Sequence, residues 1–411
     1  MAHKTEASRE YPLPRALARI IYNYYFDAPA ISANYYEFYA LCVDGTLYVH
    51  DTTVLQPHTK RYTDIENIEI SFALGVVHRY GRKFSFGRME QWQPKLDNLD
   101  LSKVDALFSN YTWFAALMKD KTVQTWPSKD ASHLHRTEID SKKLEGVVRI
   151  YSTNDAFAAL KSDGTVVTWG DTERGGDSSG VKKQLTEVKD IFNTHAAFAA
   201  LKKDGTVVTW GENSTGGDSR VVSKELKAVV DICGTSSSFA ARRLDGSVVT
   251  WGENSTGGDS SKVSKELAAG VVHICPTSYA FVARTGAGGL VTWGGIDIGA
   301  LEVVQRALGS QPVKHLYSNG GVFTAIAGTT AVTWNPRFCL MNITEIGNLS
   351  PLRVVSIQRL FLATNANGDA VVWGEATRGV GYVGYALEYA RMLNEHQLSI
   401  RAAFKIATGM E

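Results

Sequence analysis

The sequence predicts an all-β protein, a β-propeller built from about nine repeats of about 41 residues each. Three observations predict it: a tryptophan that recurs at a nearly constant interval, an Asp-Gly turn between two apolar runs, and a chain of 411 residues with 37 glycines and 17 tyrosines. Trp169, Trp210, Trp251 and Trp293 all stand in a "VTWG" sequence, at intervals of 41, 41 and 42 residues. A period near 41 is typical of one propeller blade and is too long for one coil of a β-helix.

Weaker copies extend the repeat in both directions. Trp126, Trp334 and Trp373 occupy the same position in degraded copies, and Phe86 and His50 stand there nearer the N-terminus. The nine anchors are 36 to 43 residues apart. They predict nine blades.

Each repeat is expected to contain three to four short antiparallel strands. In the copy from Gly146 to Asp190, "GVVRIYS" and "AFAALK" are followed by the turn "SDG" and by "TVVTWG". Asp-Gly between apolar runs is a strong hairpin signal, because glycine accepts a positive φ without steric cost. The predicted hairpin turns are Asp163-Gly164, Asp204-Gly205 and Asp245-Gly246. The later stretch "GVKKQLTEVKD" fits either one or two helical turns or a short outer strand.

The tryptophans are predicted to form the core between blades, since a blade cannot bury both of its faces alone and tryptophan is highly buried on average. The alternative is that they are platforms on which sugars stack. The predicted core positions are Trp126, Trp169, Trp210, Trp251, Trp293, Trp334 and Trp373.

The polar loops after the tryptophans contain candidate ligand-facing residues. Asp177, Asp218 and Asp259 recur in "GGDS", and Asn213 and Asn254 recur in "GENSTGGDS". Regularly spaced acids could bind cations or a repeated ligand. The alternative, which we favour, is that Asp and Ser cap the following turn, because a calcium loop needs more oxygen ligands than this stretch supplies.

Composition excludes several function classes. A net charge of +1 gives no electrostatic basis for binding nucleic acid or an anionic membrane. We find no metal motif, no cofactor motif and no catalytic constellation, so we expect no enzyme. Cys233 and Cys275 occupy a position that holds Tyr151 and Phe192 in earlier repeats, which favours inert core thiols. Without a signal peptide or an apolar span, the default expectation is a cytoplasmic protein, with signal-less export or virion association as alternatives.

The stretch "AALKSDGTVVTWGD…GGDS" resembles the repeat of the regulator-of-chromosome-condensation family, most clearly in residues 155–260. "GENSTGGDS" departs from that family, which has a "GQLG"-like run there. The resemblance implies a β-propeller of seven blades, which stands as the alternative to nine. It also implies a possible activity as a guanine-nucleotide exchange factor for a small GTPase.

The expected domain organisation is an N-terminal tail at residues 1–14 and a repeat propeller at 15–384. A short helix and closing strands of the same propeller follow at 385–411. We expect a non-enzymatic scaffold for protein partners of unknown identity. The alternatives are the exchange factor and a multivalent carbohydrate-binding or cell-surface-binding module of a bacterium or virus.

Overall fold

The computed structural model describes only part of the chain. The described residues are 31–33, 37–41, 47–51, 59–62, 65–71, 74–79, 82–86, 99–100, 103–127, 136–137, 139, 141–295, 300–337, 341–346, 353–357, 360–364 and 370–374. Side chains are described only within residues 99–346. The predicted tail at 1–14 and the predicted helix and closing strands at 385–411 lie outside the described residues.

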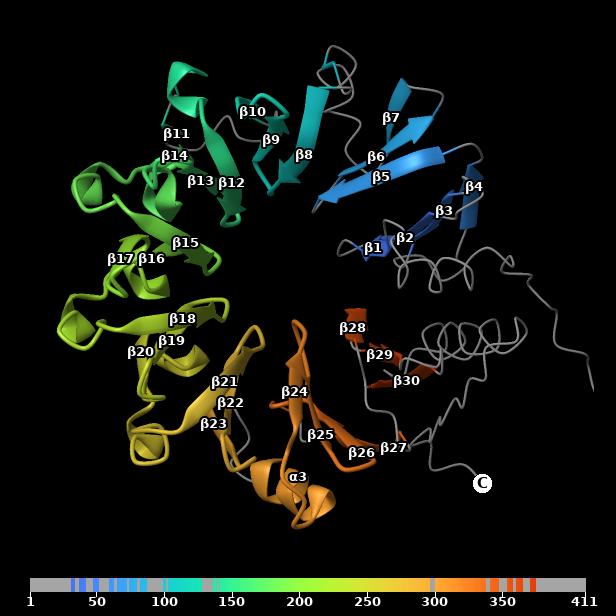
Figure 1. The fold of residues 1–411 in the computed structure, drawn as a ribbon, viewed down its shortest axis with the longest axis vertical. Coiled ribbons are helices and arrows are strands. Elements are labelled where there is room, and N and C mark those ends of the chain that lie inside the picture. The colour runs from blue at the N-terminus through green and yellow to red at the C-terminus, as the bar shows by residue number, and fades with distance from the viewer. Residues whose placement is uncertain are drawn as a thin grey trace, which may run out of the picture.

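The prediction of an all-β propeller is confirmed. The described strands form nine antiparallel sheets of three or four strands. The sheets follow one another in chain order around a common centre, and the first strand of each lies innermost, except that β12 (Val147–Ser152) is innermost in the sheet whose outer edge is β11 (Arg136–Thr137) (Figure 1). The number of blades in the complete propeller stays a prediction.

The strands are short, and each sheet is a local run of the chain. The first three sheets contain β1 (Ile31–Ala33), β2 (Glu37–Leu41), β3 (Leu47–Asp51) and β4 (Thr59–Tyr62); β5 (Ile65–Ser71), β6 (Leu74–Arg79) and β7 (Arg82–Phe86); β8 (Val104–Ser109), β9 (Trp113–Met118) and β10 (Val123–Pro127). The next three contain β11 (Arg136–Thr137), β12 (Val147–Ser152), β13 (Ala156–Lys161) and β14 (Val166–Asp171); β15 (Val188–Asn193), β16 (Ala197–Lys202) and β17 (Val207–Gly211); β18 (Val229–Gly234), β19 (Ser238–Arg243) and β20 (Val248–Gly252). The last three contain β21 (Val271–Pro276), β22 (Ala280–Thr285) and β23 (Leu290–Gly294); β24 (His315–Ser318), β25 (Phe323–Ala327), β26 (Thr330–Trp334) and β27 (Met341–Glu345); β28 (Arg353–Ile357), β29 (Leu360–Thr364) and β30 (Ala370–Gly374).

In the described residues, single helical turns and the helix α3 (Ala300–Leu308) lie between the strands of successive sheets. The turns are η4 (Ser141–Leu144), η5 (Thr172–Gly176), η6 (Ser179–Val181), η7 (Asn213–Thr215), η8 (Arg220–Val222), η9 (Asn254–Thr256) and η10 (Ser261–Val263). The helix α3 (Ala300–Leu308) buries Ala300, Val304 and Leu308 against the sheet β24–β27. In the part of the chain that the structure describes, no helix has the length and apolar character that a membrane crossing requires.

The hairpin between the second and third strands has the expected turn. Gly164 has φ +80°, and the Asp163 carboxylate accepts hydrogen bonds from the Thr165 backbone N–H at 2.9 Å and hydroxyl at 2.6 Å. The turn also contacts the next sheet, because the Gly164 carbonyl accepts the Val188 backbone N–H at 2.9 Å. The turns at Gly205 and Gly246 repeat this arrangement. Each hairpin thus fixes the start of the next blade.

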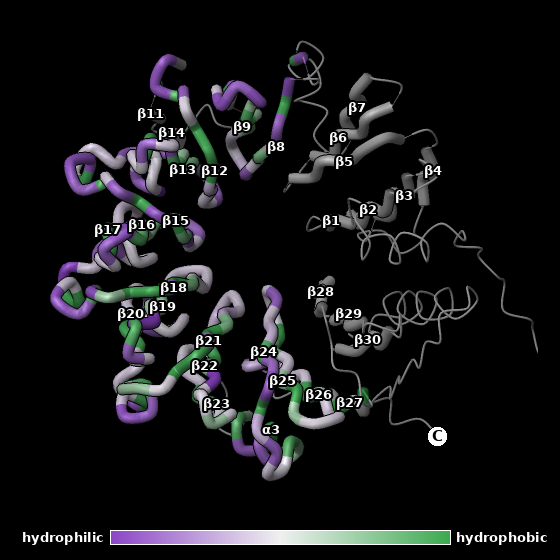
Figure 2. The backbone as a smooth tube through the Cα atoms, viewed as in Figure 1, coloured by the Kyte–Doolittle hydropathy of each residue, from purple (hydrophilic) through white to green (hydrophobic). Residues whose placement is uncertain are grey.

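The core between sheets is built on a Phe–Trp pair. Phe198 on β16 lies directly opposite Trp210 on β17, with their ring centroids 5.2 Å apart. The phenylalanine is fully buried, and the pair packs against residues of the preceding sheet such as Ala156 and Leu160. Equivalent pairs are Phe114–Trp126, Phe157–Trp169, Phe239–Trp251, Phe281–Trp293 and Phe323–Trp334. Trp373 lies on β30 opposite Phe361, where only the backbone is described. Figure 2 shows the hydrophobic strands and the mostly hydrophilic turns at the outer edge.

The loop after the third strand contains two successive glycines in three sheets, at residues 175–176, 216–217 and 257–258, and we call it the Gly-Gly loop. It covers the Phe–Trp pair of the next sheet. Gly216 has φ +98°, and a Cβ atom there would lie 2.6 Å from the Phe239 ring. Its carbonyl accepts a hydrogen bond from the Trp251 indole N–H at 3.0 Å. Gly175 and Gly257 make the same contacts with the sheets that follow them. A glycine is therefore required here by both backbone conformation and space.

We predict that Gly216→Ala destabilises the protein by about 2 to 4 kcal/mol, because it adds a clash with Phe239 to the strain of a positive φ. Gly270→Ala is the first control, since Gly270 has φ +77° but open space around it, and should cost about 1 kcal/mol. Gly180→Ala, with open space and no positive φ, should be nearly neutral. Urea unfolding followed by tryptophan fluorescence measures all three. Equal losses for Gly216→Ala and Gly270→Ala would contradict the packing role.

We predict that Trp210→Phe costs about 1 to 3 kcal/mol more than Trp113→Phe. Both tryptophans are buried, at 5% and 6% exposure. The Trp210 indole N–H bonds the Gly175 carbonyl at 3.0 Å, whereas the buried Trp113 N–H has no partner among the described residues. Only the first substitution leaves a buried carbonyl without its donor. Thermal or urea unfolding of the two variants gives the difference, and similar losses would show that the indole bond contributes little.

Candidate interaction surface

One end of the sheets carries a row of loops that we call the loop rim. It consists of the loops between the innermost and the second strand of six successive sheets: residues 110–112, 153–155, 194–196, 235–237, 277–279 and 319–322. The Gly-Gly loops begin at this same end of the sheets, because the third strands also finish there. The Asp-Gly hairpins lie at the opposite end.

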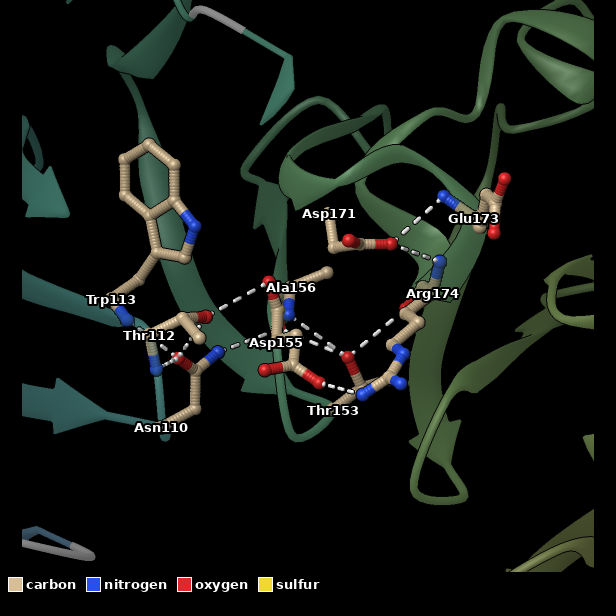
Figure 3. Close-up of polar contacts among 9 residues, drawn as sticks. All are labelled: Asn110, Thr112, Trp113, Thr153, Asp155, Ala156, Asp171, Glu173 and Arg174. Carbon is tan, nitrogen blue, oxygen red and sulfur yellow. Dashed lines mark hydrogen bonds and ion pairs between the residues drawn. The ribbon is translucent and has the colours of Figure 1, made fainter. Parts of the chain in front are cut away.

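Each loop of the rim has a fixed backbone shape. Its first residue is Thr or Asn, and that side chain accepts the backbone N–H three residues later. Thr153 accepts from Ala156 at 3.0 Å, and Asn110 accepts from Trp113 at 2.8 Å (Figure 3). The Thr153 hydroxyl also donates to the Arg174 carbonyl at 3.1 Å, which ties the loop to the Gly-Gly loop of its own sheet. Such local side-chain bonds hold a tight turn without the help of a ligand.

Backbone hydrogen bonds join the six loops into one row. The N–H of Asn154 donates to the His195 carbonyl at 2.9 Å, and the N–H of His195 donates to the Ser236 carbonyl at 2.9 Å. The same bond links Tyr111 to Asn154, Ser236 to Ser278 and Ser278 to Gly320, at 3.0 to 3.1 Å. Six loops from six blades are therefore held in register with one another.

The side chains on this row differ from blade to blade, although its backbone repeats. Two tyrosines are exposed, Tyr111 at 49% and Tyr279 at 38%. The Arg337 guanidinium lies 3.5 Å from the centre of the Tyr279 ring, a cation–π contact between two sheets. Exposed tyrosine and arginine are the residue types enriched in protein interfaces.

One blade also carries a buried carboxylate at the rim. The Asp155 side chain is 7% exposed, and it accepts a 2.5 Å ion pair from Arg174, which is 50% exposed (Figure 3). This contact raises the pKa of Arg174. Nearby, the Asp171 carboxylate accepts the backbone N–H groups of Glu173 and Arg174, each at 3.0 Å. Each of the two carboxylates is thus held by groups of its own blade, which indicates a structural role. We call the ion pair between Asp155 and Arg174 the clasp.

The sequence did not indicate this clasp, since its partners are 19 residues apart. The next blade has Ala196 and Thr215 at the two positions. That departure from the repeat was the available signal.

The predicted ligand-facing acids lie on the outer loops, where each accepts a backbone N–H two residues later. Asp177 accepts from Ser179 at 2.8 Å, Asp218 from Arg220 at 3.0 Å, and Asp259 from Ser261 at 2.8 Å. These bonds start the turns η6, η8 and η10, as the capping alternative expects. Their exposed neighbours Asn213 and Asn254 begin the turns η7 and η9. A binding role for these five residues stays a prediction.

The two thiols that the structure describes lie between sheets. Burial raises the pKa of Cys275 to about 12 and raises that of Cys233 as well. Few thiolates therefore form near neutral pH. Among the described residues, no group of three or more His, Cys, Asp and Glu side chains could hold a metal ion.

No family model and no curated protein matches the chain. Solved structures with similar folds include the computationally designed Ika8 protein, at 13% identity over 84% of this chain and 95% of that chain, with a TM-score of 0.38. Prp20p from Saccharomyces cerevisiae is 16% identical over 70% of this chain and 86% of its own, also with a TM-score of 0.38. Human WBSCR16 is 14% identical over 66% and 88%, with a TM-score of 0.36. Likeness at this level concerns the fold alone.

We predict that Arg174→Thr destabilises the protein by about 1 to 3 kcal/mol, because it leaves the buried Asp155 carboxylate without its cation. The double variant Asp155→Ala/Arg174→Thr should lose less, since it reproduces the pair Ala196 and Thr215 of the next blade. Urea unfolding of the two single variants and the double variant gives the coupling energy. A double variant less stable than Arg174→Thr would contradict the clasp.

Proposed function

We propose that this protein is a non-enzymatic interaction scaffold that binds protein partners through the loop rim. The observation that carries the proposal is the row of backbone hydrogen bonds that joins six loops whose side chains differ. A rigid frame keeps the entropic cost of binding low, because the loops are already ordered. Different side chains on equivalent positions let one surface match an asymmetric partner.

The tyrosines of the rim are the expected contact residues. Tyr279 is held over Arg337, and Tyr111 is exposed on the same row. Aromatic and arginine side chains of this kind supply most of the binding energy in protein interfaces.

We also propose that the chain is a divergent member of the regulator-of-chromosome-condensation family. The repeated Asp-Gly turn and the Trp-Gly ending of the third strand support this. The two alternative functions, exchange factor and carbohydrate-binding module, have no feature of the described residues in their favour, and they enter as outcomes of the test.

We predict that a partner captured from the native host is lost on Tyr111→Ala/Tyr279→Ala and kept on Leu244→Ala. Leu244 is a matched control, since it is 77% exposed on a hairpin at the opposite end. Capture with the purified full chain, followed by binding measurements on each variant, gives the result. Equal binding by the two variants would contradict the rim as the interface.

Two further assays separate the alternatives. A glycan array tests the carbohydrate-binding module, and nucleotide release from a panel of small GTPases tests the exchange factor. Saturable glycan binding or accelerated release, without a protein partner that depends on the rim, would overturn the proposal.

A further inference from the structure

Two arginines stand where the repeat has buried leucine. Leu160 and Leu201 lie near the ends of β13 and β16 and are 4% and 2% exposed. The equivalent residues of the next two sheets are Arg242 on β19 and Arg284 on β22. The same change in two consecutive sheets replaces apolar packing by charge at one level of the propeller.

Strand alternation sets where these arginines point. Ala240, two residues before Arg242, packs against the sheet β21–β23, so Arg242 faces that sheet. Val282, two residues before Arg284, packs against the sheet β24–β27, so Arg284 faces the sheet β24–β27. The two guanidiniums therefore lie in successive inter-sheet seams beside the innermost strands.

Both arginines are partly exposed to solvent, and in the part of the chain that the structure describes neither guanidinium takes part in a hydrogen bond or an ion pair. The Nε atoms of Arg242 and Arg284 are buried without a hydrogen bond, and neither side chain forms an ion pair. Arg243, the next residue, shows the usual state: its guanidinium donates to the Lys227 carbonyl at 3.1 Å and to the Ser247 hydroxyl at 3.3 Å. Arg149, Arg174 and Arg220 each form an ion pair with an aspartate.

The surroundings of the two arginines are cationic. His273 is the register partner of Arg284, and its pKa is lowered by burial, by Arg284 and by Arg242, while Asp231 acts in the opposite direction. The pKa of His315 on β24 is lowered by burial, Arg284 and Lys314. The carboxylate facing this group is Asp231, the register partner of Arg242, and no ion pair joins the two. Cation charge is therefore in excess.

We propose that Arg242 and Arg284 form an oxyanion-binding site on the inner side of the sheets β18–β20 to β24–β27. A phosphate or carboxylate group supplies the several acceptors that a guanidinium fork matches. His273 lies on β21, which contacts both β19 and β22, the strands that carry the two arginines. Its imidazole supplies a further donor. The site lies toward the Asp-Gly end of the strands, away from the loop rim, so it is independent of the proposed function.

The test uses inorganic phosphate and acetate as probes in calorimetric titrations of the full chain at constant ionic strength, since screening would otherwise mask binding. We expect saturable binding of at least one probe. Binding of phosphate alone indicates a phosphoryl ligand, and binding of acetate indicates a carboxylate ligand. No saturable binding of either probe overturns the proposal.

The variants Arg242→Leu and Arg284→Leu should each weaken binding about tenfold or more. The chain itself places leucine at the equivalent positions Leu160 and Leu201, so both variants are expected to fold, and circular dichroism checks this. Arg243→Leu removes the same charge one residue away and should change the affinity by less than about twofold, as long-range charge effects are screened. An equal loss for Arg243→Leu would mean that net charge, rather than the two unpaired guanidiniums, attracts the probe, and would overturn the site.

Discussion

The contact between a Gly-Gly loop and the Phe–Trp pair of the following sheet holds this fold together. One blade cannot bury both of its apolar faces by itself. At three successive junctions the third strand ends in a glycine loop that covers the next sheet's aromatic pair and accepts its indole N–H, as Gly216 does for Phe239 and Trp251. At these junctions each blade completes the core of its neighbour, so stability is shared along the chain rather than held within one blade.

The contacts between blades explain why some parts of the repeat are nearly identical and others differ. Residues that contact the next blade are restricted in size and backbone conformation, so they repeat. The loops of the rim are joined to the next blade by a backbone hydrogen bond that is the same at every junction, as between Asn154 and His195. Side chains add contacts at single junctions, as the Ser236 hydroxyl does to the Ser278 carbonyl. Because this shared bond uses backbone groups alone, it does not depend on which side chains the middle residues of the loops carry. A surface with constant geometry and variable chemistry is the result, and it suits recognition.

The sequence was sufficient for the architecture and insufficient for the site. The interval of the tryptophans and the Asp-Gly turns predicted the sheets, because local turn chemistry and strand alternation decide these features. The phenylalanine opposite each tryptophan was missed, although "AFAALK" contains it, since cross-strand pairing depends on register. The clasp of Asp155 and Arg174 and the unpaired Arg242 and Arg284 were missed because their meaning depends on which blades meet in space. The blade count still depends on chain ends that lie outside the described residues.

The repeated contact between a Gly-Gly loop and the next Phe–Trp pair has an evolutionary consequence. Since the loop of one blade fits the aromatic pair of any similar blade, duplicating or deleting one whole period in the gene creates no mismatched seam. The near-identical stretches Asp204–Ser219 and Asp245–Ser260 match the expected product of such a duplication. Growth by whole periods alters the circumference and the number of rim loops together, so a lineage could change the size of the proposed interaction surface in single genetic steps.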